Sequence, residues 1–210
     1  MLRIDETSGT LVAPKAATLV TEVAPDRDEL LALVGASWEA FSAELGMPSL
    51  RLLARDAAAG VDVLAFDEQE GRAVVVILTG ETIEWQVGRA LGAAAEVASW
   101  DAARLASVHE ALEAAVPGDS PRLVVVAGGW EASALVTVEW LARRHGVEVS
   151  AFSVKVLRVG GERLLSIRRE PADGAPDPAA EVQWMLTGGE PVPSTGAVAA
   201  AVASTPPPSH

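Results

Sequence analysis

The stretch from Gly60 to Thr79 constrains this chain more than any other, because it contains two strand-like runs joined by a short turn. Val61–Phe66 and Arg72–Thr79 are rich in β-branched and aliphatic residues, and the acidic turn Asp67–Gly71 ends in glycine, a pattern that predicts a β-hairpin. The second run is apolar at nearly every position, which is typical of a strand covered on both faces. We therefore expect this hairpin inside the sheet of an α/β protein.

Asp62 is an acidic residue at the head of the first strand, in an otherwise apolar run. Burying a carboxylate without a partner is costly. The sequence therefore predicts that Asp62 accepts hydrogen bonds, forms an ion pair or binds a metal.

The hairpin and the helix expected after it resemble the PD-(D/E)XK nuclease superfamily, and within it the small bacterial and archaeal endonuclease-like domains of restriction-endonuclease fold. In those domains the first strand reads roughly G-x-D-hydrophobic-hydrophobic-A, and this chain has GVDVLA from Gly60. Their next strand reads V-V-x-E-L-K and is followed by a helix with Gln-Ala-Leu. Here Ile77 stands in place of the Glu, Thr79 in place of the Lys, and Arg89 in place of the Gln.

In an active member of that superfamily, the Asp and the Glu ligate a divalent metal, usually Mg²⁺, and the Lys helps to position or deprotonate the attacking water. Ile77 cannot ligate a metal, and Thr79 carries no charge. The resemblance therefore implies a nuclease scaffold whose vestigial site positions are Asp62, Ile77, Thr79 and Arg89, with no catalytic residue, metal or other cofactor retained. Asp62 is then expected to be structural, bonded to backbone N–H groups or paired with Arg89.

A relocated acidic residue is the alternative. Glu81 or Glu84, near the start of the following helix, would complete a Mg²⁺ site with Asp62, and Glu39 and Glu44 on an earlier helix are further candidates. The protein would then be a metal-dependent nuclease that hydrolyses DNA phosphodiester bonds. No Lys lies near these positions, and Arg, with a pKa above ~12, is a poor proton shuttle.

The net charge of −13 disfavours nucleic acid as a partner, because a protein that holds a phosphate backbone usually presents a basic surface. A non-cleaving nucleic-acid binder is thus a third, weaker reading. No run of the ~20 apolar residues that a membrane helix needs is present, so no membrane association is expected. The absence of cysteine fits a cytoplasmic protein.

The remaining elements follow from turn, capping and periodicity signals. They are a small hairpin within residues 1–14; helices over Glu29–Leu45, from Glu81 or Thr82 to about Ser99, over Asp101–Ala115 and over Glu131–His145; and strands over Leu50–Arg55, Arg122–Ala127, Val147–Leu157 and Arg163–Arg168. This order is that of the restriction-endonuclease-like core, a mixed central sheet flanked by helices. The resemblance covers roughly Glu29 to Glu170.

The junction Gly128-Gly129 lies between a predicted strand and a predicted helix, where backbone N–H groups can bind an anion. Glu131 at the helix start would repel a phosphate, so a tight turn is the better prediction.

The composition changes after the core. Residues 171–210 are dominated by Pro, Ala, Gly, Ser and Thr, and too little apolar surface is present to offset the entropy of ordering. The sequence therefore predicts one α/β domain over residues 1–170 and a flexible tail over 171–210, in which Trp184 and the stretch Ala197–Ala203 are candidates for docking on the domain or on a partner. The functional expectation is a catalytically silent nuclease-fold protein that serves as an interaction or assembly module, with a protein partner or a homo-oligomer.

Overall fold

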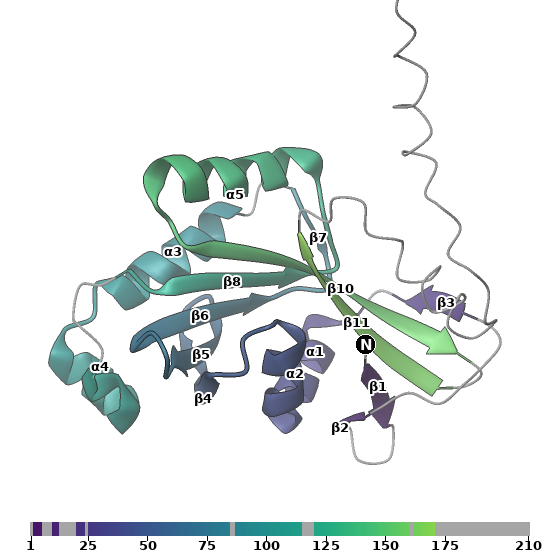
Figure 1. Ribbon diagram of the computed structural model, residues 1–210, viewed down its shortest axis with the longest axis horizontal. Helices are drawn as coiled ribbons and strands as arrows, with labels where there is room; N and C mark the ends of the chain where they lie inside the picture. Colours follow the sequence, from purple (N-terminus) through teal and green to yellow (C-terminus); the bar gives the residue numbers. More distant parts are fainter. Residues whose placement is uncertain are drawn as a thin grey trace, which may run out of the picture.

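The computed structural model describes residues 2–5, 10–12, 20–23, 25–84, 87–114, 120–159 and 162–170. Within these ranges, nine strands form one mixed sheet (Figure 1). Along the sheet the strands are β2 (Thr10–Val12), β1 (Leu2–Asp5), β11 (Glu162–Glu170), β10 (Val149–Val159), β8 (Arg122–Ala127), β6 (Arg72–Leu78), β5 (Val61–Asp67) and β4 (Leu50–Ala58), and β3 (Val20–Val23) pairs with the far half of β10. The mixed α/β class predicted from the sequence is confirmed.

The strands β4, β5 and β6 form the expected antiparallel meander, with Ala65 paired to Leu52 on one side and to Val74 on the other. β8 lies parallel to β6, and β10 lies parallel to β8. β6 is therefore an interior strand, which explains why its sequence is apolar on both faces. The antiparallel strands β11, β1 and β2 continue the sheet beyond β10.

One face of the sheet is covered by α1 (Arg27–Ala36) and α2 (Trp38–Glu44). The sequence predicted a single helix here, and that prediction is wrong, because the backbone leaves the helical region at Ser37 (φ −141°). The break turns α2 toward β4, where the indole Nε1–H of Trp38 donates to the carbonyl oxygen of Leu50 at 2.7 Å. The buried apolar side chains of this face include Leu30, Leu33, Val34 and Phe41 from the helices and Val63, Ala65, Val74, Val76, Val124 and Val126 from the strands.

The other face is covered by α3 (Val87–Ala98), α4 (Ala102–Val108), the 3₁₀ helix η1 (Glu110–Ala114) and α5 (Ala132–His145). The predicted helix over Asp101–Ala115 is divided at His109, whose backbone is extended and whose ring Nδ1 accepts from the amide of Ala111 at 3.0 Å. The buried apolar side chains of this face include Leu64, Phe66, Val75, Leu123 and Val125 from the strands and Val87, Ala90, Ala93, Leu105, Leu112 and Val138 from the helices.

The start of the predicted third helix differs from expectation. Thr82–Ile83 forms a short strand, β7, which pairs in parallel with β9 (Gly129–Trp130), and the helix begins only at Val87. By contrast α5 ends as predicted, at Gly146 in the left-handed conformation (φ 65°). Residues 171–210, and with them the predicted tail and its docking candidates, lie outside the described residues. Among the described helices none is long and apolar enough to cross a membrane.

Candidate functional site

A pocket of about 220 Å³ lies at the carboxyl ends of the parallel strands β6 and β8, the end of an α/β sheet at which ligands usually bind. The structure brings five of the residues predicted from the sequence to its walls, namely Asp62, Ile77, Thr79, Glu81 and Arg89. Glu84, Glu39 and Glu44, the other candidate acids, are not among the lining residues.

Strand register explains why these positions meet. Val63 pairs with Val76, which sets Asp62 opposite Ile77 on the neighbouring strand. Asp62 meets Arg27 of α1, whereas Ile77 packs against the core under α3 and α5, on the other face of the sheet. Asp62, Ile77 and Thr79 nevertheless line one pocket, because it opens at the ends of their strands.

Asp62 is almost completely buried, with 5 % of its surface exposed, and both of its carboxylate oxygens are bonded. Oδ2 accepts a hydrogen bond from the backbone amide of Leu78 at 2.6 Å. Oδ1 forms an ion pair with the guanidinium of Arg27, the first residue of α1. The sequence offered backbone N–H groups or Arg89 as the partners of Asp62. A backbone N–H is indeed one partner, and the arginine is Arg27 instead of Arg89.

Arg27 is the residue that sequence reasoning missed. Its guanidinium also lies 3.1 Å from Asp28 and 3.8 Å from Asp56, so three carboxylates surround it. The hydrogen bond that Arg27 donates to Asp62, together with the negative charge of Asp62, raises the pKa of Arg27 above the ordinary value for arginine. Arg89 reaches the same pocket from α3 but is exposed, and the contacts of Asp62 among the described residues do not include it.

Close backbone packing places Arg27 over Asp62. A Cβ atom at Gly80, just after β6, would lie 1.7 Å from the carbonyl oxygen of Pro25, so only glycine lets the start of α1 approach this end of the sheet. A Cβ atom at Gly128 would similarly lie 2.0 Å from the carbonyl oxygen of Gly80. These two glycines hold the loop after β6 between the loop after β8 and the segment that leads into α1.

Backbone amides at the glycine junction after β8 donate hydrogen bonds to carbonyl oxygens of the protein itself. The amide of Gly128 donates to the carbonyl oxygen of Glu81 at 2.9 Å, and the amide of Glu131 donates to that of Ile83 at 3.0 Å. These bonds argue against an anion site, but the predicted tight turn is instead a bend at Gly128 followed by the short strand β9. Trp130 then closes one wall of the pocket, with its Nε1–H donating to the carbonyl oxygen of Phe152 at 2.9 Å.

The pocket offers limited chemistry. Its lining includes two carboxylates, Asp62 and Glu81, and the oxygens of Asp62 already have partners. The hydroxyl oxygen of Thr79 accepts from the amide of Glu81 at 3.1 Å. Within the described ranges, no three His, Asp or Glu side chains gather closely enough to hold a metal ion.

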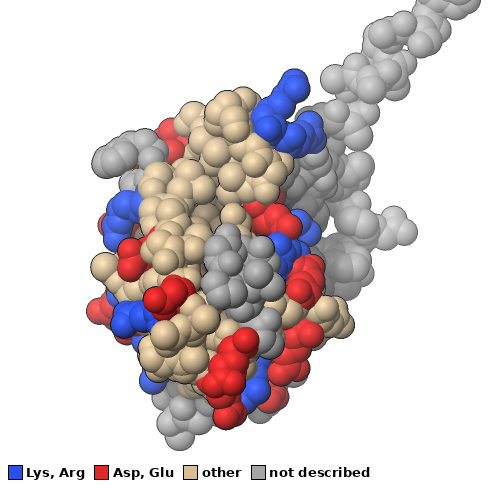
Figure 2. Space-filling model, turned by 90° about the vertical axis from the view of Figure 1, so that its left-hand side faces the viewer, with Lys and Arg blue, Asp and Glu red and all other residues tan. Residues whose placement is uncertain are grey.

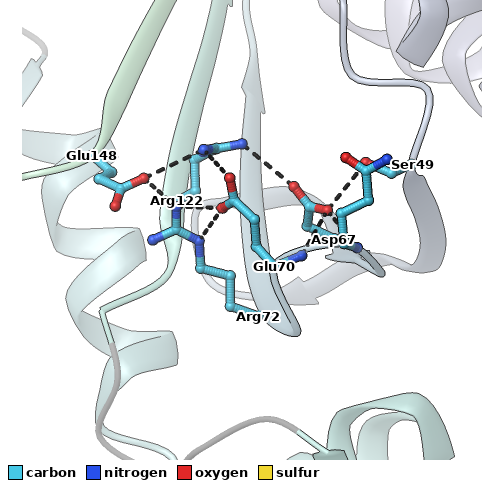
Figure 3. Close-up of polar contacts among 7 residues, drawn as sticks. Ser49, Asp67, Glu70, Arg72, Arg122 and Glu148 are labelled. Carbon is cyan, nitrogen blue, oxygen red and sulfur yellow. Dashed lines mark hydrogen bonds and ion pairs between the residues drawn. The ribbon is translucent and has the colours of Figure 1, made fainter.

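A second polar cluster, which we call the arginine network, lies at the amino ends of β6 and β8, whereas the Asp62 pocket lies at their carboxyl ends (Figure 3). Arg122 contacts Asp67 at 3.4 Å and Glu70 at 2.8 Å, and Arg72 pairs with Glu70 and Glu148. The guanidinium of Arg72 holds the pKa of Glu148 below its ordinary value, and Glu148 in turn raises the pKa of Arg72. These groups satisfy one another, so the network ties the β5–β6 turn to the starts of β8 and β10.

No protein-family model, curated protein or solved structure matches this chain. The structure by itself therefore defines the class: a mixed α/β sheet with helices on both faces, and a buried aspartate–arginine pair in a pocket at the carboxyl ends of its parallel strands.

Proposed function

We propose that this chain is a restriction-endonuclease-like protein of the PD-(D/E)XK type that has lost cleavage and serves as an interaction or assembly module. The observation that carries the proposal is the pairing of Asp62 with Arg27, because a guanidinium bonded to the carboxylate occupies the position where an active enzyme would need a metal ion. One positive charge from the protein itself thus replaces the cation.

The arrangement of elements supports the nuclease-like part of the proposal. A helix precedes the meander β4–β5–β6, further helices cross over to the parallel strand β8, and α5 leads to β10. The resemblance assigns the same order to the restriction-endonuclease-like core. The motif positions Asp62, Ile77 and Thr79 also meet in one pocket, as a nuclease site requires.

The loss of cleavage is supported by the residues that fill those positions. Ile77 is half-buried and packs against the apolar core under α3 and α5. Thr79 has no charge with which to polarise a water, and the guanidinium beside Asp62 is a poor base. Ile77, Thr79 and Arg27 therefore provide neither a metal ligand nor a general base that would activate a water for attack on phosphorus.

Charge distribution argues against nucleic acid as the partner. The chain carries a net charge of −13. On the face that Figure 2 presents, Lys and Arg side chains alternate with Asp and Glu rather than forming a continuous basic area. A phosphate backbone binds to concentrated positive charge, so a protein partner or a second copy fits this surface better.

The direct test incubates the purified protein with single- and double-stranded DNA and RNA in Mg²⁺ and in Mn²⁺. We expect no cleavage, and titration with either ion should show no saturable site that depends on Asp62. Glu81 lines the pocket, so it is the acid to remove if cleavage is found. Cleavage that disappears both in Asp62→Ala and in Glu81→Gln would establish the relocated-acid nuclease and overturn the proposal.

The mass of the protein in solution tests the proposal that it is an interaction or assembly module. Light scattering across a range of protein concentrations reports whether the chain forms a homo-oligomer. A second copy as partner predicts a mass that rises with concentration toward a closed multiple of 21.7 kDa. If the protein is a monomer at every concentration, the proposed partner must be a different protein.

A further inference from the structure

A groove of about 330 Å³ lies between α5 and the sheet, and Val138 is the one residue that its lining shares with the Asp62 pocket. Its apolar wall is formed by Leu135, Val138 and Ala142 from α5 and by Val149 and Ala151 from β10. Its volume falls within the roughly 300–1,000 Å³ that binding pockets occupy. The rest of the lining is polar or charged, namely Glu139, Arg143, Ser150, Arg169 and Glu170. The groove therefore suits an occupant that carries both apolar and charged side chains.

The described chain ends beside this groove. Arg169 and Glu170, the last residues of β11, both line it, and Glu170 pairs with Ala151 on the groove wall. The next apolar segment in the sequence, Val182–Leu186, begins only twelve residues after Glu170. A fully extended chain covers ~3.3–3.6 Å per residue, so this segment can reach any part of the groove, and a tether this short keeps its local concentration high.

The charges of the groove and of the following segment are complementary. Arg169, near the end of β11, lines the groove and is exposed. The acids of the groove are already engaged, since Glu139 pairs with Arg143 at 2.7 Å and Glu170 accepts from Ser153 at 2.8 Å. Residues 171–190 contain Asp173, Asp177, Glu181 and Glu190 and no Lys, Arg or His.

The apolar residues of the segment have the spacing that a groove requires. Val182, Trp184 and Leu186 alternate with Gln183 and Met185. In an extended conformation alternate side chains share one face, so three apolar side chains could enter the groove together while Gln183 faces solvent.

We propose that Val182–Leu186 docks in the groove between α5 and β10, with Trp184 as its anchor and the acids before it facing Arg169. The segment then covers the groove in cis, and a partner that binds this surface must displace it. This inference concerns a surface apart from the Asp62 pocket and does not depend on the proposed loss of cleavage.

The test uses the absence of cysteine from the chain. Gln183→Cys places a single nitroxide label on the side of the segment that faces away from the groove, in the full-length ¹⁵N-labelled protein. Paramagnetic broadening should remove most of the intensity of the amide signals of Ala142, Arg143 and Ser150. The amide signals of β4, at the far edge of the sheet, should keep theirs.

A matched control distinguishes the broadening caused by docking from the broadening caused by the short tether alone. Gln183→Cys combined with Trp184→Ser carries the same label on the same tether but lacks the anchor, so the broadening around α5 should fall sharply. Replacing Arg169 by Glu should reduce it as well. Equal broadening with and without Trp184, or none at α5, would overturn the proposal.

A mixed sample distinguishes the source of the segment. Unlabelled chains that carry the nitroxide are mixed with ¹⁵N-labelled chains without it. We expect no broadening of the α5 signals in this mixture, because the segment docks within its own chain. Broadening in the mixture that matches that of the directly labelled sample would show that a second copy supplies the segment, and the proposal of docking in cis would be wrong.

Discussion

The replacement Arg27→Met removes the cation beside Asp62 while keeping a side chain of similar length. It leaves a carboxylate that is 5 % exposed and that keeps, among the described residues, the amide of Leu78 as its partner. A hydrogen bond to a charged group contributes ~1.5–3 kcal/mol, and breaking a buried pair costs ~3–5 kcal/mol. The side chain of Arg27 is 45 % exposed, so water can approach in its place and screening lowers the figure. We expect a loss of about 1.5–2.5 kcal/mol in the free energy of unfolding.

The assay is urea unfolding at pH 7 of the wild type, Arg27→Met, Asp62→Asn and the double variant. A double-mutant cycle over these four proteins should give a coupling energy of ~1–2 kcal/mol, because the two side chains touch. Asp62→Asn keeps an acceptor for the amide of Leu78, so the cycle isolates the ion pair from that hydrogen bond.

Arg89→Met is the matched control, because Arg89 lines the same pocket but is exposed. Its effect should stay within about 0.5 kcal/mol, as for most surface substitutions. The reasoning is refuted if Arg89→Met costs as much as Arg27→Met, or if the coupling between Arg27 and Asp62 is close to zero.

Three further predictions concern the same framework. Ile77→Glu should cost about 2–4 kcal/mol by thermal unfolding without metal, because it puts a carboxylate in place of a half-buried side chain that packs under α3 and α5; a silent variant would mean that position 77 faces solvent. Gly80→Ala should cost about 2–4 kcal/mol, because its Cβ would lie 1.7 Å from the carbonyl oxygen of Pro25; full stability would show that this contact is not tight. Arg72 lowers the pKa of Glu148 below 4.5, so wild type should exceed Glu148→Gln in stability at pH 7 and lose this advantage as the pH falls below about 4.5; an advantage that grows in acid would contradict the assignment.

The central strands were predictable because their signals are local. The apolar run of β6, the turn before it and the parallel strand β8 each follow from residues that are neighbours in the sequence. An interior strand needs apolar side chains on both faces whatever surrounds it. The end of α5 at Gly146 has the same local origin, since only glycine readily takes the left-handed conformation that stops a helix there.

The elements that the sequence misplaced are those where tertiary contacts override local preference. Thr82–Ile83 pairs as β7 because Gly129 lets the strand β9 lie against it, and that partner is far away in the sequence. The break at Ser37 follows from the need of α2 to pack on β4, which the apolar spacing of one long amphipathic helix does not reveal. β3 was not predicted, and its place beside β10 is likewise a long-range pairing.

Some features of the Asp62 pocket likewise follow from the sequence, and others only from the tertiary structure. The sequence by itself indicated that Asp62 stands at the head of a strand in an otherwise apolar run, and that a carboxylate buried there must have a partner. Only the tertiary structure decided that the partner is Arg27, because several arginines could reach the carboxylate and the selection depends on how α1 approaches the end of the sheet. That approach is set by the contact between Gly80 and Pro25. Packing between segments distant in sequence, and not any local pattern, fixes which charge lies beside Asp62.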